Sequence, residues 1–350
     1  MEEKRSSVKR ILAIAGLVIL LVVAAAGWNI YNRVLAPNVH ISSNEKYYLF
    51  IATGSDFNAV MDTLNHTGIL DNIESFTWVA DRMEYPEHVK PGRYLLTDGM
   101  NNKDLVSLLR SGKQSPVRVT FNNVRTIEQL AGRISKLLEA DSSSLVSVFK
   151  NDTLLKENNL NIYNSNSILI PNTYEFYWNT SAKQFYDRMN KEYHNFWTPA
   201  RLEKLKETEL TQQEVSVIAS IVEQETHQDS EKPVVAGVYI NRFKQGWKLE
   251  ADPTLIYALG DFTIHRVLNQ HKEVDSPYNT YMHTGLPPGP ICIPGIPSID
   301  AVLNYTRHDY YYFCAKDDFS GYHAFAKSYA DHLLNAKRFH KALSQRGIFN

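Results

Sequence analysis

The stretch VIASIVEQET, residues 217–226, combines a run of apolar side chains with two carboxylates at its end. Thr211 and Glu214 precede it at the spacing of a capping box, which predicts that a helix begins there. At about 100° per residue, the apolar side chains from Val215 to Val222 form one broad arc of that helix. The stretch therefore predicts a helix that packs through one face and ends in acidic residues.

The two carboxylates of this helix point in different directions. Glu225 lies inside the apolar arc, one turn beyond Ile221 and Val222, whereas Glu223 points away from it. Burial and the negative end of the helix dipole both raise the pKa of such a carboxyl, which is the profile of a general acid at neutral pH. The pattern alone leaves a second interpretation open, in which Glu225 reaches solvent or a partner Arg where the apolar face ends.

Helical patterns dominate the chain on both sides of this stretch. Further helices are predicted from Thr198 to about Glu207, between Ser230 and Gly246, from the cap Asp252 to Gly260, and from about Ser328 to Gly347. A long Pro/Gly loop, SPYNTYMHTGLPPGPICIPGIPS, and a strand-like segment, YYYFCAK, lie between the last two helices. A loop of this length in a compact domain is usually functional.

Three strand–turn–helix patterns precede the helical part. Their strands are predicted at Tyr47–Ala52, Tyr94–Leu96 and Val117–Phe121, each followed by a turn and by apolar residues at helical spacing. Together with the helices above, this pattern indicates an α+β fold. The first two units fit a LysM-like β-α-α-β module, which would bind glycan, and they fit a generic α+β packing domain equally well.

The N-terminus is typical of a membrane anchor. Four Lys and Arg side chains in the first ten residues precede Ile11–Trp28, which is 18 residues long and carries no charge. This length reaches across a bilayer, and the charge distribution predicts that the N-terminus is inside and the remaining chain outside. The small residues Ala24–Ala26 leave a cleavable signal peptide open, although the length of the run favours an uncleaved anchor.

Composition excludes several classes of function. The 350 residues include 37 basic and 38 acidic side chains, so there is no basic excess for nucleic-acid binding. Motifs typical of metal hydrolases, nucleotide-binding enzymes and serine hydrolases are absent, and we predict no cofactor and no metal. Cys292 and Cys314 are too few for a disulfide framework, and we interpret them as small core residues; the sequence leaves open whether they pair.

Four segments resemble one family. ASIVEQET, DPTLIYALG, SPYNTYMHTGLPPGPICIPG and GYHAF, in this order behind one N-terminal span, are similar to the endolytic murein transglycosylases, the YceG-like family. The resemblance covers roughly residues 40–345. It implies an enzyme of the bacterial cytoplasmic membrane, with its catalytic domain outside, that cuts peptidoglycan strands internally between MurNAc and GlcNAc. It also implies 1,6-anhydro-MurNAc ends, a LysM-like module ahead of the catalytic domain, and penicillin-binding protein synthases as partners. We expect the enzyme to terminate nascent strands, although the sequence leaves trimming of old strands open.

The resemblance and the patterns above suggest the following division of the chain. We expect a cytoplasmic tail at 1–10, a transmembrane anchor at 11–28, a linker at 29–45, a LysM-like module at 46–115 and a YceG-like catalytic domain at 116–347.

The resemblance also suggests site residues. The catalytic acid of the family lies in an E-x-E-T stretch, which implies Glu225 as catalyst here, first as acid and then as base, with Glu223 as support or second choice. The other expected substrate-binding residues are Tyr278, Asn279, Thr280, Tyr281, Gly285, Pro287, Pro288, His323, Phe325 and Asp252.

Two rival functions stay open. A muramidase would use water as acceptor and would need a second carboxylate, for which Asp252 is the best choice, although its position before Pro253 favours a helix cap. The other rival is a non-catalytic wall-binding or scaffold protein.

Overall fold

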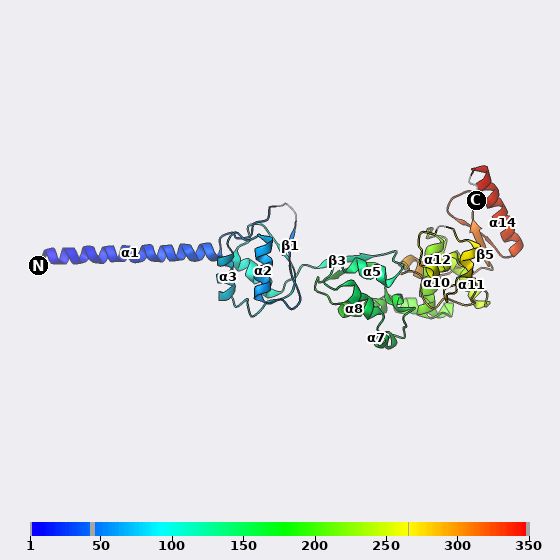
Figure 1. Ribbon diagram of the computed structural model, residues 1–350, viewed down its shortest axis with the longest axis horizontal. Coiled ribbons are helices and arrows are strands. Elements are labelled where there is room, and N and C mark those ends of the chain that lie inside the picture. The colour runs from blue at the N-terminus through cyan, green and yellow to red at the C-terminus, as the bar shows by residue number, and fades with distance from the viewer. Residues whose placement is uncertain (1, 43–45, 265, 348–350) are drawn as a thin grey trace. The chain divides into compact units, whose positions relative to one another are not determined.

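The computed structural model describes residues 2–42, 46–264 and 266–347 (Figure 1). Met1 of the expected tail and residues 43–45 of the expected linker lie outside this part of the chain. The chain divides into two compact units, Met1–Val117 with Glu175–Asn179 and Arg118–Tyr174 with Thr180–Asn350. Each unit combines helices with short antiparallel strands, which confirms the α+β class.

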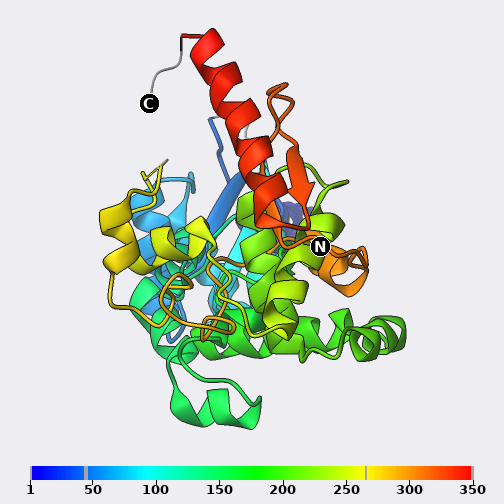
Figure 2. The same cartoon turned by 90° about the vertical axis from the view of Figure 1, so that its right-hand side faces the viewer.

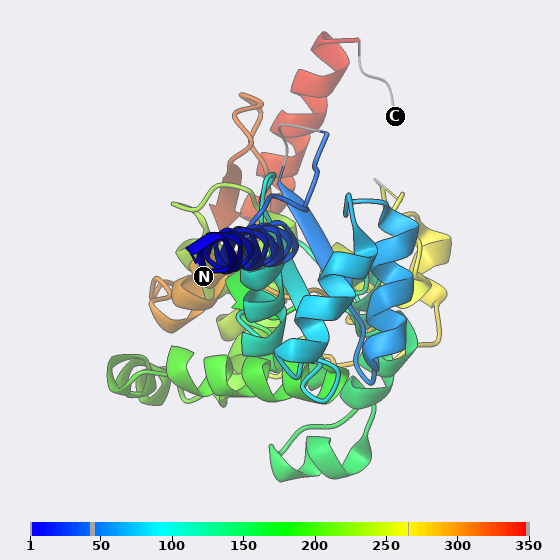
Figure 3. The ribbon, with the colours of Figure 1, turned by 90° about the vertical axis from the view of Figure 1, so that its left-hand side faces the viewer.

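The N-terminal segment is one continuous helix, α1 (Glu2–Val34), which Figure 3 shows end on. It extends beyond the predicted 11–28 span at both ends, and Lys9–Val34 is long and apolar enough to cross a membrane. Its last turn is held to the rest of the first unit by a hydrogen bond of 2.8 Å, which the Asn102 side chain donates to the carbonyl oxygen of Arg33.

The first unit has the order β-α-α-β-α. Its elements are β1 (Tyr47–Ile51), α2 (Phe57–Thr67), α3 (Ile73–Arg82), β2 (Gly92–Leu96) and α4 (Asn102–Ser111). Asp56 caps α2 by accepting a hydrogen bond from the amide of Ala59. The strands pair antiparallel with Leu49 opposite Tyr94, and both side chains are buried in the core of this unit. The sequence pattern missed α3, which is the second helix of the β-α-α-β order.

The second unit is mostly helical. Its first half contains β3 (Val117–Phe121), α5 (Ile127–Ile134), α6 (Ser142–Phe149), α7 (Asp152–Glu157), η1 (Ser165–Ile168), β4 (Asn172–Phe176), α8 (Ala182–Phe196) and α9 (Pro199–Thr208). The first residue of β3 and the last two residues of β4 belong to the first unit. Its second half contains α10 (Gln212–Glu225), α11 (Lys232–Lys244), α12 (Asp252–Leu259), η2 (Asn269–Glu273), α13 (Ile296–Leu303), β5 (Tyr312–Ala315), β6 (His323–Ala326) and α14 (Tyr329–Gln345). β3 pairs with β4, and β5 pairs with β6.

Helix α10 is the centre of this second half. The predicted capping box is present, since the amide of Glu214 donates to the Thr211 hydroxyl and the amide of Thr211 donates to the Glu214 carboxylate. The apolar arc packs on α11, α12 and α13, and Ile218, Ile221 and Val222 are fully buried. The end of α10 is therefore fixed in place by a close-packed core.

The hairpin β5–β6 and helix α14 form the C-terminal part of the second unit. Tyr312 pairs with Ala326 across the hairpin, and α14 lies along it in Figure 2. No residue of α14 is buried, and three of the four residues of β6 are only partly covered. This part holds few core side chains and leaves aromatic groups at the surface.

Candidate active site

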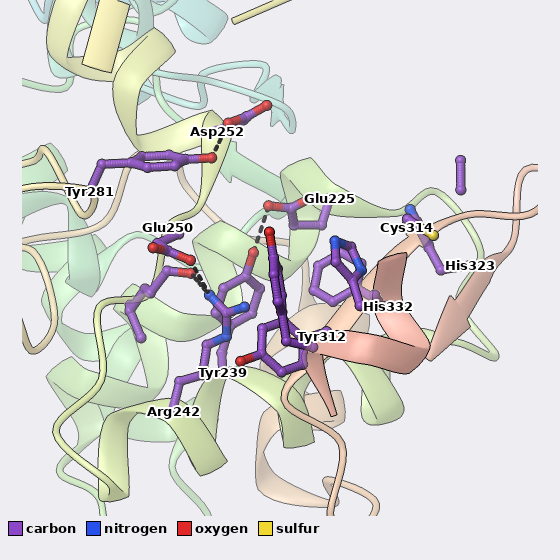
Figure 4. Close-up of a pocket in the computed structure, with 14 residues that line it drawn as sticks. Glu225, Tyr239, Arg242, Glu250, Asp252, Tyr281, Tyr312, Cys314, His323 and His332 are labelled. Atoms are coloured by element: carbon purple, nitrogen blue, oxygen red, sulfur yellow. Dashed lines mark hydrogen bonds and ion pairs between the residues drawn. The ribbon is translucent and has the colours of Figure 1, made fainter. Parts of the chain in front are cut away.

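A pocket of about 370 Å³ opens at the C-terminal end of α10 (Figure 4). It is lined by residues of α10, α11, α12, the loops before and after α12, the β5–β6 hairpin and α14: Glu225, Tyr239, Arg242, Leu249, Glu250, Asp252, Tyr281, Tyr312, Phe313, Cys314, Ala315, His323, Tyr329 and His332. Ionisable and aromatic side chains predominate, so the pocket suits a ligand with both hydroxyl groups and apolar faces.

Glu225, the last residue of α10, carries the most perturbed carboxyl of the pocket. Burial is the main cause that raises the pKa of this carboxyl, whereas the hydrogen bond from Tyr239 lowers it. The negative charge of Asp252 raises the pKa and the positive charge of Arg242 lowers it, and the resulting pKa is about 7. The Tyr239 hydroxyl donates this bond to Oε1 at 2.6 Å. The position of Glu225 and the direction of its pKa shift agree with the helical-wheel prediction, while its catalytic role stays a prediction.

Tyr239 and Arg242 come from one face of α11, three residues apart. The Arg242 guanidinium is almost fully buried and donates to the carbonyl oxygens of Tyr311, at 2.7 Å, and Leu249, at 2.8 Å. It also pairs with Glu250 at 3.3 Å. Sequence reasoning missed both residues, although polar side chains at this spacing in the apolar run VVAGVYINRF are a usable signal.

Asp252 does not cap α12, so that interpretation is wrong. The residue at the cap position is Ala251, and no side chain caps this helix; Asp252 is the first helical residue. Its carboxylate accepts a 2.6 Å hydrogen bond from the Tyr281 hydroxyl and lines the pocket that contains Glu225. The loop residue Thr280 provides the anchor instead, since its hydroxyl accepts from the amide of Ala251 at 3.0 Å.

The other residues of the YNTY segment hold the loop together. The Asn279 side chain is fully buried and donates to the carbonyl oxygens of Lys272 and Val274. The Tyr278 ring is buried against Tyr257. The structure therefore brings Tyr281, but not Tyr278, Asn279 or Thr280, to the pocket.

The Pro/Gly part of the loop does not line the pocket either. Gly285 has a φ of 83°, in the left-handed region that favours glycine, so it serves a turn. Pro287 is buried and Pro288 is half-buried. Their predicted role as a wall of the groove is not supported at this pocket.

Glu223 lies in a separate polar cluster. Its carboxylate accepts a hydrogen bond from Ser298 at the start of α13 and pairs with Lys232 at 3.4 Å. Lys232 is buried and also pairs with Asp229 at 2.8 Å. Glu223 is absent from the pocket lining, so it supports the packing of α10, α11 and α13.

Of the two residues predicted from GYHAF, only His323 lines the pocket. Its Nδ1 lies 2.7 Å from the carboxylate of Glu231, the residue before α11. Phe325 instead stacks on Tyr310, with ring centroids 5.7 Å apart, and packs against Phe313.

The two cysteines are both free and lie in different surroundings. Cys292 is buried, as predicted for a core residue, and contacts the backbone of Ser220 and the side chain of Gln224. Cys314 is only partly covered and lines the pocket, so the core interpretation is wrong for this residue. Within residues 2–42, 46–264 and 266–347, no group of three or more His, Cys, Asp or Glu side chains is arranged to hold a metal ion.

Three residues that the sequence did not single out form an aromatic wall of the pocket. Tyr312 of β5 stacks on His332 of α14, with centroids 5.5 Å apart, and Tyr329 lies 5.8 Å from Tyr312. The Arg242 guanidinium lies 5.3 Å from the Tyr312 ring. These residues are far apart in the sequence, and only the pairing of the hairpin with α14 brings them together.

A partly buried carboxyl with a pKa near neutrality, held by a tyrosine and facing aromatic rings, is the arrangement expected of a general acid. The YceG-like family model matches residues 49–338. This range is most of the chain, and the protein belongs to the YceG-like family.

Relatives in other organisms extend the comparison. An endolytic murein transglycosylase of Bacillus subtilis is 26% identical over 319 residues, with 87% of each chain covered. An endolytic murein transglycosylase of Streptococcus pneumoniae is 28% identical over 354 residues, which are 92% of this chain and 64% of the relative. The crystal structure of a YceG-like protein from Listeria monocytogenes aligns with a TM-score of 0.54 and 27% identity, over 83% of this chain and 99% of that one.

Proposed function

We propose that this protein is an endolytic lytic transglycosylase of peptidoglycan, which cuts glycan strands between MurNAc and GlcNAc and leaves 1,6-anhydro-MurNAc ends. The observation that carries the proposal is Glu225, a partly buried carboxyl with a pKa of about 7 in a pocket of polar and aromatic side chains. The family membership and the names of the relatives support the substrate class.

The first step is proton donation by Glu225. At neutral pH a carboxyl with a pKa of about 7 is protonated in about half of the molecules, so it can donate to the glycosidic oxygen as the bond to C1 breaks. The hydrogen bond from Tyr239 to Oε1 fixes the carboxyl plane and leaves Oε2 for the leaving oxygen. The C6 hydroxyl of the same sugar then attacks C1 as a base of the pocket takes up its proton, which closes the anhydro ring without water.

The remaining pocket residues bind the sugars. Tyr312 and Tyr329 offer aromatic faces on which the apolar face of a pyranose ring can stack. Asp252 and Tyr281 share a hydrogen bond and lie on the opposite side of Glu225 from the hairpin in Figure 4. From there they accept hydrogen bonds from sugar hydroxyl groups and donate to them.

Hydrolysis by a muramidase is the second candidate, and the position of Asp252 favours it. Asp252 and Glu225 line the same pocket, and two carboxyl groups are the minimum for acid and base or acid and nucleophile. In this reaction Asp252 activates water, or attacks C1 itself, and the product carries a reducing end.

The N-terminal unit fits a membrane-anchored enzyme. Helix α1 spans the bilayer with its basic end inside, and its last turn is bonded to the first unit through Asn102, as expected of an anchor that stays attached. The β-α-α-β order of the first unit supports a LysM-like module that binds glycan. The enzyme then acts outside the cytoplasmic membrane on nascent strands, next to penicillin-binding protein synthases.

The test is product analysis by mass spectrometry. Full-length protein in detergent is incubated with purified peptidoglycan, in parallel with Glu225→Gln and with Glu223→Gln as the matched control. We expect anhydro ends from the wild type and from Glu223→Gln, and none from Glu225→Gln. Products heavier by one water would identify a hydrolase, and Asp252→Asn should then abolish this activity. Binding of peptidoglycan by the wild type without cleavage would identify a scaffold protein.

A further inference from the structure

His323 and Glu231 form a pair at the edge of the pocket that the mechanism above does not use. Glu231 accepts two hydrogen bonds from His323, one from its backbone amide and one at Nδ1, both at 2.7 Å. The hydroxyl of Thr226, the residue after Glu225, bonds to the same carboxylate at 3.2 Å. The Glu231 side chain is only 4% exposed, so a carboxylate with almost no access to solvent is used to hold one histidine.

This contact determines which ring nitrogen is available. Glu231 lies against Nδ1, so Nδ1 carries the hydrogen and Nε2 is the free nitrogen. Nε2 has no hydrogen-bond partner among the residues that the structure describes, and His323 lines the pocket that contains Glu225. Phe313 packs its ring at 82° to the imidazole, which fixes the ring from a second side.

Glu225 has one oxygen available for two tasks. Its Oε1 accepts the hydrogen bond from Tyr239, so Oε2 must protonate the glycosidic oxygen and, if it acts alone, must also remove the proton of the C6 hydroxyl. A second group in the same pocket relieves this requirement. We infer that His323 is this group: its Nε2 accepts the proton of the C6 hydroxyl as that oxygen attacks C1, and Glu231 is the positioning residue that orients the ring.

This inference rests on the proposed transglycosylase reaction, and the protons balance. The carboxyl proton of Glu225 passes to the leaving oxygen as the C1–O bond breaks, the bond between O6 and C1 forms, and the hydroxyl proton passes to Nε2. The carboxylate of Glu231 compensates the positive charge that the imidazole acquires. The site is reset when His323 releases a proton to solvent and Glu225 takes one up.

The test uses the full-length protein in detergent with purified peptidoglycan, His323→Ala, and the exposed His227→Gln as a matched control. We expect His323→Ala to lose about 10²-fold in rate, the lower end of the range for general-base catalysis. Added imidazole should restore part of the rate, and the share of reducing ends should rise because water competes with a C6 hydroxyl that has lost its base. His227→Gln should behave as the wild type.

The outcomes are distinguishable. Rescue by imidazole, or a larger share of reducing ends, supports the inference; a His323→Ala protein with neither change, whatever its rate, overturns it. If His323→Ala lowers the unfolding temperature, Glu231→Gln serves as the second variant. A Glu231→Gln protein with the rate and the products of the wild type would overturn the inference. A wild type that forms no anhydro ends refutes the proposed function itself, before the His323 variant is considered.

Discussion

Glu225 and Glu223 lie two residues apart on α10, but the pocket around Glu225 and the polar cluster around Glu223 differ in their charges and hydrogen-bond partners. Glu225 faces a tyrosine donor and a second carboxylate, and its pKa rises to about 7. Glu223 faces the ammonium group of Lys232 and the hydroxyl of Ser298. Two residues turn a helix by about 200°, so the two side chains meet different neighbours. The comparison shows that the surroundings, and not the residue type, separate a carboxyl with a raised pKa from a carboxylate in an ion pair.

The largest expected difference between the two regions is in catalysis. Glu225→Gln removes the proposed proton donor and should lower the rate by about 10²–10⁴-fold, whereas Glu223→Gln should change it by less than about threefold. Rates of strand cleavage measured for both variants test this. Equal losses in the two variants would break the comparison.

The second difference is in how stability depends on pH. The pKa of Glu225 is raised from 4.5 to about 7 in the folded state, so the folded protein binds this proton more tightly than the unfolded chain does. The stabilisation of the folded state by this proton is therefore complete below pH 4.5 and is lost as the pH rises through about 7. Across this range the free energy of unfolding of the wild type should fall by about 3 kcal/mol relative to that of Glu225→Gln.

Chemical denaturation of the wild type and Glu225→Gln at both ends of the pH range measures this loss. Glu223→Gln is the control for general effects of pH. A difference between wild type and Glu225→Gln that stays constant with pH would show that Glu225 titrates normally.

Tyr239→Phe sharpens the comparison, because it removes the hydrogen bond that lowers the pKa of Glu225 while burial remains. The pKa of Glu225 should rise further, and the alkaline limb of the pH–rate profile should move to higher pH. The rate on the plateau should fall by about 3–10-fold, as expected for one lost hydrogen bond that orients the carboxyl. A limb that moves to lower pH would mean that Tyr239 acts in another way.

The smallest effect on activity is expected in the Glu223 cluster, where the change should be in stability. Glu223→Gln leaves the buried Lys232 with Asp229 as its remaining carboxylate partner, and the amide keeps an acceptor for Ser298. We expect a loss of about 1–2 kcal/mol in the free energy of unfolding. Thermal or chemical unfolding measures it, and a loss of activity without a loss of stability would assign Glu223 a direct role.

Local signals explain how much of the fold was predictable. The caps at Thr198 and Thr211 and the apolar periodicity of α10 depend on neighbouring residues only, and the structure agrees with them. Helix α3 was missed although Asn72 caps it. The cap at Asp252 was predicted wrongly, because an aspartate before a proline fits both a helix cap and a first helical position.

The sequence by itself determined the apolar N-terminal helix, the α+β class, the family, and the orientation of Glu225 on its helix. These follow from chain-local properties, namely hydrophobic periodicity, capping residues and motif order. Only the tertiary structure decided which residues surround Glu225. Tyr239, Arg242, Tyr312 and His332 meet there because α11, the β5–β6 hairpin and α14 pack around the end of α10. The same packing buries Asn279 and leaves Asp252 at the pocket. Contacts between distant segments decide which polar groups face the pocket, and no local pattern encodes these contacts.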